Sequence, residues 1–173
     1  MHVLGAIAAS GPFSGLPLWP LPNGFTGQGP VFFIGCHGGA GTSTLHRLLP
    51  NSVDAGRYWP APQSGFVNAV LVARTHADGL RWAQGAIRQW ADGSIPPAVN
   101  LLGLAAVADA PGRLPKPLKQ LLDLISGGVP NLWQLPWVEA WRLGDPVDRT
   151  SMPSAYLKMS TELQQLIPGA SGV

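Results

Sequence analysis

The residues best suited to chemistry lie in the stretch GCHGGAGTST, residues 35–44. This stretch follows the apolar run VFFI and precedes LHRLLP, so it joins an expected strand to an expected helix. Gly38, Gly39 and Gly41 carry no side chains that would obstruct the backbone, and successive N–H groups in such a turn attract anions. The stretch therefore predicts a phosphate-binding loop whose donors belong to the main chain. The alternative is a tight strand-to-helix turn without a ligand.

The loop departs from the usual phosphate-loop pattern, GxxxxGK[ST], in which the lysine reaches the phosphates and the hydroxyl residue holds magnesium. When the two are aligned on Gly41, Cys36 stands at the first glycine and Thr42 at the lysine. Ser43 takes the hydroxyl position and is the predicted magnesium ligand. The loop thus keeps its backbone donors and loses its fixed positive charge. The predicted ligand contacts in the loop are His37, Gly38, Gly39, Ala40, Gly41, Thr42, Ser43 and Thr44.

Further polar residues follow the next expected strand, in the segment RTHADG. Ligands of open α/β sheets gather at the carboxyl ends of strands, so Arg74, His76 and Asp78 are candidates to line the site. Their alternative roles are a surface arginine, a loop histidine and a helix cap. For Asp78 the helix cap is the favoured interpretation.

The single cysteine, Cys36, cannot form an internal disulfide, which is typical of a reducing compartment such as the cytoplasm. A nucleophilic arrangement of Cys36, His37 and Asp54 is disfavoured. Adjacent residues of one loop rarely face each other, and nothing in the sequence indicates a lowered pKa for the thiol.

The elements that must position these residues alternate between strand and helix. Continuous apolar runs predict buried strands, and apolar residues at helical spacing predict amphipathic helices between them. This alternation is typical of a parallel sheet covered on both faces. The predicted fold class is therefore α/β, a three-layer sandwich with a mainly parallel sheet. Strands are expected at 31–35, 66–73, 100–108 and 131–137, and helices at 43–49, within 74–93 and 116–128, as a turn at 138–144, and at 153–167 with Ser154 as cap.

Two segments are expected to lie outside this pattern. Residues 1–29 are rich in glycine and proline without a helical or strand period, so they predict a flexible arm ahead of one domain at 30–173. Residues 51–65 are expected to form a long polar connection. The start of the chain has no basic region ahead of its apolar residues, so a signal peptide is not expected.

Composition narrows the classes of function. Only 12% of the residues are charged and 46% are hydrophobic, which predicts a folded core and surfaces suited to a protein partner. The net charge is +2 without any Lys/Arg cluster, so direct nucleic-acid binding is not supported. No apolar run is long enough to span a bilayer. The spacing of Trp133, Trp137 and Trp141 suggests one contiguous aromatic patch.

The segment HGGAGTSTL resembles the deviant phosphate loop KGGxGK[ST]T of the MinD and ParA superfamily of ATPases. His37 and Thr42 stand where that motif has its two lysines. The branch of this superfamily that localises Tad pili has similar loops, GGxGxST, without the second lysine. Similarity extends over about residues 31–144, through VLVARTHADGL and LWQLPWVEAWRLG. The resemblance implies a P-loop NTPase-like fold that binds ATP or another nucleotide with magnesium.

The resemblance also implies further contacts and a missing function. The segment ADAPGRLPKPL corresponds to the loop that packs on the base, so Asp109 is a candidate for contact with base or ribose, or else a turn residue. Of the superfamily's catalytic aspartates, only Asp54 lies in the equivalent interval. Losing these groups removes most of the electrostatic stabilisation of phosphoryl transfer, so efficient hydrolysis is not expected.

The whole chain, moreover, resembles an actinobacterial protein family often encoded near plasmid and mobile-element genes. HGGAGTSTL, VARTHADGL, ADAPGRLPKPL and LPWVEAWRLGD carry this second resemblance. Two functions follow as hypotheses. The first is a pseudo-ATPase in which a nucleotide stabilises a conformation or a homodimer with little turnover. The second is an adaptor that uses the same fold to bind a protein partner, without a nucleotide, in plasmid maintenance, transfer or secretion machinery.

Overall fold

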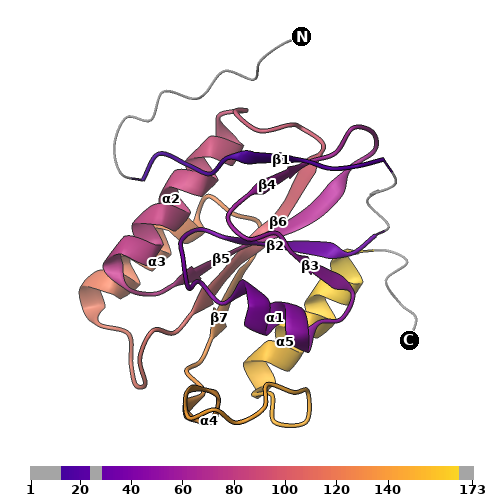
Figure 1. Ribbon diagram of the computed structural model, residues 1–173. Helices are drawn as coiled ribbons and strands as arrows, with labels where there is room; N and C mark the ends of the chain where they lie inside the picture. The colour runs from indigo at the N-terminus through magenta and orange to yellow at the C-terminus, as the bar shows by residue number, and fades with distance from the viewer. Residues whose placement is uncertain (1–12, 24–28, 168–173) are drawn as a thin grey trace.

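Five parallel strands form the central sheet of the computed structural model, which describes residues 13–23 and 29–167 (Figure 1). Counted in chain order, the strands are arranged 2-1-3-4-5, so the direction of winding reverses between the first and the third of them. The predicted α/β class and parallel sheet are confirmed. The order across the sheet is β3 (Ser52–Asp54), β2 (Val31–Gly35), β5 (Val67–Arg74), β6 (Val99–Val107) and β7 (Leu132–Leu135).

Helices cover both faces of the sheet because the winding reverses. α1 (Thr42–Leu48) and α5 (Ser154–Leu166) pack on one face, and α2 (Ala77–Ala91) and α3 (Lys116–Ser126) pack on the other (Figure 1). The short α4 (Glu139–Arg142) contributes no buried residue. The elements therefore form three layers.

The alternation of side chains along β2 shows how the sheet separates two cores. Phe32 and Ile34 point into the core under α2 and α3, whereas Val31 and Phe33 point into the core under α1 and α5. Every residue of β2 is buried, as its continuous apolar sequence requires. Burying each of these side chains contributes about 1.5–3 kcal/mol, so both cores help to fix the position of the loop that follows β2.

The N-terminal segment packs on the domain, which corrects the prediction of a flexible arm. β1 (Leu18–Pro20) pairs in parallel with β4 (Trp59–Ala61), and Leu16 and Leu21 are buried. The expectation of an arm over 1–29 is therefore wrong for residues 13–23, while residues 1–12 and 24–28 lie outside the described part. The polar connection expected at 51–65 instead contains β3 and β4.

One buried side chain, Gln89 of α2, holds this segment. Its Oε1 accepts hydrogen bonds from Leu16 N–H and from Trp59 Nε1, both at 2.8 Å, and its Nε2 donates to the carbonyl oxygen of Leu16 at 2.7 Å. Phe13 also packs edge-to-face against Trp82, with ring centroids 5.2 Å apart. We call residues 13–21, together with Gln89 and Trp59, the N-terminal clasp.

Two helix starts differ from the prediction. α2 is capped by His76, whose Nδ1 accepts the N–H of Gly79 at 2.9 Å, so Asp78 lies inside the first turn instead of capping it. There Asp78 forms an exposed ion pair with Arg81 at 3.5 Å. α5 begins at Ser154 after Pro153, and no side chain caps it, so Ser154 is not a cap. The other predicted boundaries shift by one or two residues.

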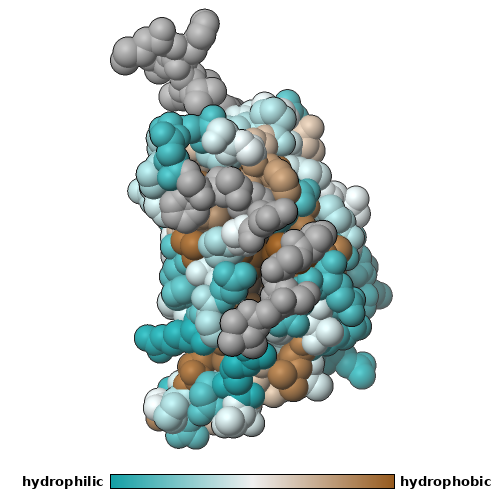
Figure 2. Space-filling model, turned by 90° about the vertical axis from the view of Figure 1, so that its right-hand side faces the viewer, coloured by the Kyte–Doolittle hydropathy of each residue, from teal (hydrophilic) through white to brown (hydrophobic). Residues whose placement is uncertain are grey.

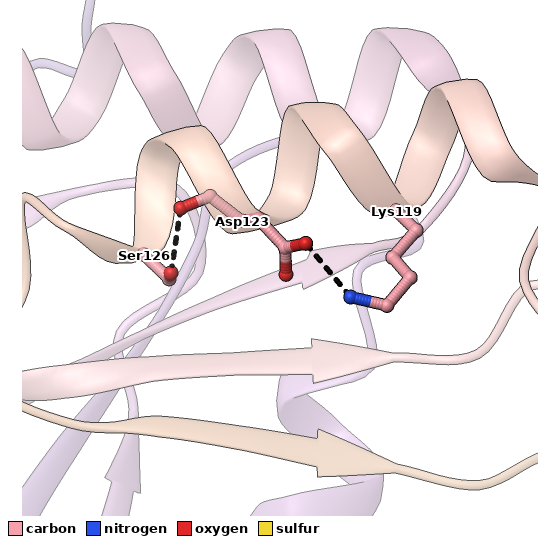
Figure 3. Close-up of polar contacts among 3 residues, drawn as sticks. All are labelled: Lys119, Asp123 and Ser126. Atoms are coloured by element: carbon pink, nitrogen blue, oxygen red, sulfur yellow. Dashed lines mark hydrogen bonds and ion pairs between the residues drawn. The ribbon is translucent and has the colours of Figure 1, made fainter.

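The solvent face of α3 carries ordinary surface contacts. Lys119 Nζ lies 2.7 Å from Asp123 Oδ2, and the Ser126 hydroxyl donates to the carbonyl oxygen of Asp123 at 2.8 Å (Figure 3). Both charged side chains are exposed, so such a pair stabilises the helix by only about 0.3–0.5 kcal/mol. This face shows no sign of a binding site.

The exposed hydrophobic side chains are dispersed. On the face shown in Figure 2, hydrophobic areas are interspersed with hydrophilic side chains. Among the described residues, the large exposed ones are Leu124 on α3, Leu157 and Leu166 on α5, and Tyr58, Phe66 and Leu143 in connecting segments. No helix in the described ranges has the length and apolar character that crossing a membrane requires.

Candidate functional site

The loop between β2 and α1, residues 36–41, lies at the carboxyl edge of the sheet, next to the reversal between β2 and β5. In doubly wound sheets this reversal opens a crevice where ligands bind. The predicted loop residues and Arg74 at the end of β5 therefore meet at the position that this topology favours.

The loop presents a series of unpaired donors. Within the described residues, the backbone N–H groups of Gly38 through Thr44 donate no hydrogen bond to the protein. The flanking residues Cys36 and Leu45 are paired: Cys36 N–H donates to Val72 at 2.9 Å and Leu45 N–H donates to Gly41 at 3.1 Å. Unpaired N–H groups of consecutive residues are the donors from which an anion site is made.

The glycines explain how the backbone adopts this form. Gly39 and Gly41 have φ angles of 74° and 110°, in the left-handed region where other residues are strained. A Cβ atom added at Gly38 or Gly39 would meet no atom within 4 Å, so these two residues face open space. The loop is therefore accessible from outside at the point where its donors are free.

The ring of His37 joins the loop to the end of β5 by hydrogen bonds. It is only 8% exposed, its Nε2 accepts the N–H of Arg74 at 2.9 Å, and its Nδ1 lies 2.8 Å from the carbonyl oxygen of Gly38. This pairing requires a neutral ring with the proton on Nδ1. Burial, together with the nearby His76, Arg57 and Arg74, lowers the pKa of His37, which favours that form. Both ring nitrogens are thus used within the protein.

Gly79 makes the close packing of this support possible. A Cβ atom at Gly79 would lie 2.4 Å from the carbonyl oxygen of Arg74 and 3.0 Å from Nε2 of His37. The rings of His37 and His76 also lie near each other, with centroids 5.1 Å apart. The start of α2 therefore positions both the loop and the end of β5.

Arg74 brings a positive charge to the loop. Its Nε donates to the carbonyl oxygen of Gly39 at 3.3 Å and its Nη1 to that of Ala108 at 3.0 Å. Its Nη2 makes no hydrogen bond to the described residues and would lie 3.8 Å from a Cβ atom at Gly41. The guanidinium group is thus fixed beside the loop with one nitrogen left for a ligand.

A cavity of about 370 Å³ adjoins the loop on the side of α1 and α5. Gly41 and Thr44 line it, so the cavity is continuous with the end of the loop. Its polar lining also includes three arginines, and Asp and Glu are absent from the lining. The remaining walls are apolar or aromatic: the lining comprises Gly41, Thr44, Leu45, Arg47, Arg74, Val107, Pro136, Trp137, Val138, Trp141, Arg142, Val147 and Tyr156.

Asp109 lies apart from the loop residues. It lines a second cavity of about 470 Å³, formed by the ends of β6 and β7 and the segment before α3. His76 and Arg113 line this cavity too, but none of the residues 36–44 does. The structure therefore brings Arg74 to the predicted loop and leaves Asp109 at a neighbouring site.

The predicted magnesium ligand and the residues of the disfavoured nucleophilic arrangement lie in separate surroundings. Ser43 is exposed at the start of α1, and the carboxylate of Asp54 accepts the N–H of Gly56 at 3.0 Å in a local turn. Among the described residues, no group of three or more His, Cys, Asp or Glu side chains could hold a metal ion. Burial raises the pKa of Cys36 to about 12, so its thiol is protonated at neutral pH, which disfavours a nucleophilic role.

Sequence reasoning missed part of this site and misjudged the tryptophans. Arg47 and Arg142 lie on different helices, and no motif or spacing connects them. Trp133 is buried and donates to Glu162 at 2.7 Å, whereas Trp137 and Trp141 line the cavity. The three tryptophans therefore do not form one contiguous patch, and the expectation of such a patch is wrong.

Comparison with known proteins places the chain in a family. Residues 29–155 match a family of unknown function, DUF6668, and the chain belongs to it. No curated protein matches the sequence. The matched range contains the loop, Arg74 and all residues of the adjoining cavity except Tyr156.

Proposed function

We propose that this member of the family binds a phosphorylated small ligand, an ATP-type nucleotide or a simpler phosphate compound, on the loop at residues 37–44. The observation that carries this proposal is the run of unpaired N–H groups from Gly38 to Thr44 beside the free Nη2 of Arg74. The similarity of HGGAGTSTL to the deviant phosphate loops supports the same conclusion.

Arg74 replaces the charge that the loop has lost at Thr42. A hydrogen bond from a charged donor contributes about 1.5–3 kcal/mol, roughly twice a neutral one. Because two carbonyl oxygens already hold the guanidinium group, little side-chain entropy is lost when a ligand binds. Backbone donors and one fixed cation together suit a phosphoryl group.

We do not expect the protein to hydrolyse a bound nucleotide rapidly. Magnesium in phosphate sites is usually held by one or two carboxylates together with the phosphates. Ser43 is the predicted magnesium ligand, and among the described residues no group of three or more His, Cys, Asp or Glu side chains could hold the ion. A water-activating carboxylate is also absent from the lining of the adjoining cavity. Without these groups, most of the stabilisation of phosphoryl transfer is missing, so the ligand acts by binding.

Titration calorimetry with inorganic phosphate, ADP and ATP, with and without magnesium, tests the proposal. We expect binding in the micromolar to millimolar range and a loss of about tenfold in Arg74→Gln, because one charged hydrogen bond is removed. Arg81→Gln is the matched control, since Arg81 is paired with Asp78 on the solvent face of α2. Absence of heat with all three compounds at millimolar concentration would overturn the proposal.

A further inference from the structure

The cavity beside the loop contains more positive charge than one phosphoryl group requires. Besides Arg74, it is lined by Arg47 of α1 and Arg142 of α4. Arg47 forms no ion pair within the described residues, and Arg142 is paired only with the exposed Glu139, at 3.4 Å. The cavity thus offers two cationic groups that the proposed phosphate site does not use.

Flat apolar groups make up much of the remaining wall. The guanidinium group of Arg142 lies 5.9 Å from the ring centroid of Trp137, and the ring of Trp141 packs edge-to-face on Tyr156 at 5.2 Å. Leu45 and Val107 complete this apolar lining. A site with apolar walls and a few convergent polar groups is the usual form of a small-molecule pocket.

Trp141 provides a second indication of a ligand. Its Nε1 is the one buried side-chain nitrogen or oxygen among the described residues that lacks a hydrogen-bond partner. An unpaired buried donor costs about 1–3 kcal/mol. Trp141 lines the cavity, so a bound ligand could supply the missing acceptor.

We propose that the ligand is a small molecule with two anionic groups, and that this cavity binds the second of them. The phosphoryl group lies on the loop, as in the proposed function on which this inference rests. The second group, a phosphate or a carboxylate, is bound by Arg47 and Arg142, and the body of the ligand lies between Trp137 and Trp141. Because Gly41 and Thr44 line the cavity, the two subsites are continuous.

The volume and the lining limit the ligand further. A volume of about 370 Å³ is near the lower end of the usual range for small-molecule sites, so the ligand is small. The cavity that contains Asp109 shares no residue with the loop, so it does not serve as the second subsite.

Calorimetry with three probes tests this inference: inorganic phosphate, pyrophosphate and 3-phosphoglycerate. We expect at least one of the two larger anions to bind about tenfold tighter than phosphate. Arg47→Gln should remove most of that gain, with a smaller effect on phosphate itself. Arg47 is exposed on α1, so the variant should fold, and Arg81→Gln is again the control.

The outcomes distinguish the phosphate site on the loop from the second anionic subsite in the cavity. A gain with pyrophosphate assigns the second group as phosphate, and a gain with 3-phosphoglycerate assigns it as carboxylate. If phosphate binds but neither larger anion binds tighter, or if Arg47→Gln behaves like Arg81→Gln, the inference is wrong and the phosphate site stands. If no probe binds, the inference is wrong, and the titrations with ADP and ATP then decide whether the proposed function fails as well.

Discussion

The loop after β2 and the N-terminal clasp use the same types of residue in opposite ways. Where α2 packs against the clasp, a Cβ atom at Gly85 would lie 2.0 Å from the carbonyl oxygen of Phe13, so this glycine is needed for close packing. In the loop, Gly38 and Gly39 have no neighbour within 4 Å. The polar groups differ in the same manner: Gln89 pairs the main chain of Leu16 completely, while the loop leaves consecutive N–H groups unpaired.

This difference separates stability from binding. Buried polar groups of a folded protein are nearly always paired, because an unpaired one costs about 1–3 kcal/mol. The clasp follows this rule and contributes to the stability of the fold. The loop leaves its donors exposed and available, which contributes little to stability and is what a ligand requires.

The largest effect is expected from Gln89→Leu. The substitution leaves the N–H and carbonyl oxygen of Leu16 and the Nε1 of Trp59 without partners, so we expect a loss of about 3 kcal/mol in the free energy of unfolding. Urea denaturation measures this loss. Gln84→Leu, on the same helix but not in the clasp, is the matched control. Equal stability of the two variants would show that the clasp contributes nothing.

The clasp also shows where sequence reasoning fails. The long strands β5 and β6 could be predicted because their apolar runs carry the signal locally. The pairing of β1 with β4 could not, since each has three residues and the hydrogen bonds that hold the segment join Leu16 to Gln89, 73 positions away. Gly and Pro in residues 13–23 suggested flexibility, although these residues also suit a closely packed extended segment.

The candidate site divides in the same way. The glycine loop and Arg74 could be predicted, because a glycine-rich turn follows one strand and a polar segment follows the next. Arg47 and Arg142 could not, because they line one cavity only as a result of tertiary packing, in which α1 and residues 138–147 share a core. The sequence also could not predict that His37 is buried and accepts the N–H of Arg74, since this arrangement depends on the close approach of Gly79.

A smaller loss in the free energy of unfolding is expected when the pH is lowered. Its cause lies at the loop, in the protonation of His37, and not in the clasp. The pKa of His37 is lowered in the folded state, so the unfolded chain takes up its proton first as the pH falls. The stabilisation present above the usual histidine pKa, about 6.5, is therefore lost progressively below it. Protonation would also break the hydrogen bond from Arg74 N–H to Nε2.

Urea denaturation at pH values of about 7.5 and about 5.5, on either side of the usual histidine pKa, measures this loss of stability, and His37→Gln should reduce it. The affinity for phosphate, measured at the same two pH values, is a second readout of the loop. The charged groups that face His37, namely His76, Arg57 and Arg74, also contribute to that affinity. The bonds of the clasp involve only Gln89, Trp59 and main-chain atoms, so the clasp itself should not open as the pH falls. Cleavage of residues 13–21 by added protease under native conditions should therefore be the same at both values, once each rate is divided by that of the same protease on an unfolded peptide at the same pH. If cleavage of residues 13–21 increased at the lower pH, the clasp would respond to pH as the loop does, and the proposed difference between the two regions would be wrong.

The smallest effect on stability is expected from Gly38→Ala. The new methyl group would meet no atom within 4 Å, and Gly38 does not have a positive φ, so stability should be unchanged or rise by up to about 1 kcal/mol. Gly39→Ala is the matched comparison, because its surroundings are equally open but its φ of 74° should cost about 1–2 kcal/mol. Gly38 lies in the run of free N–H groups and its surroundings are open, so a ligand on the loop would meet the added methyl group. Phosphate should therefore bind more weakly to Gly38→Ala despite its intact fold. Unchanged phosphate affinity would mean that the ligand does not occupy this space.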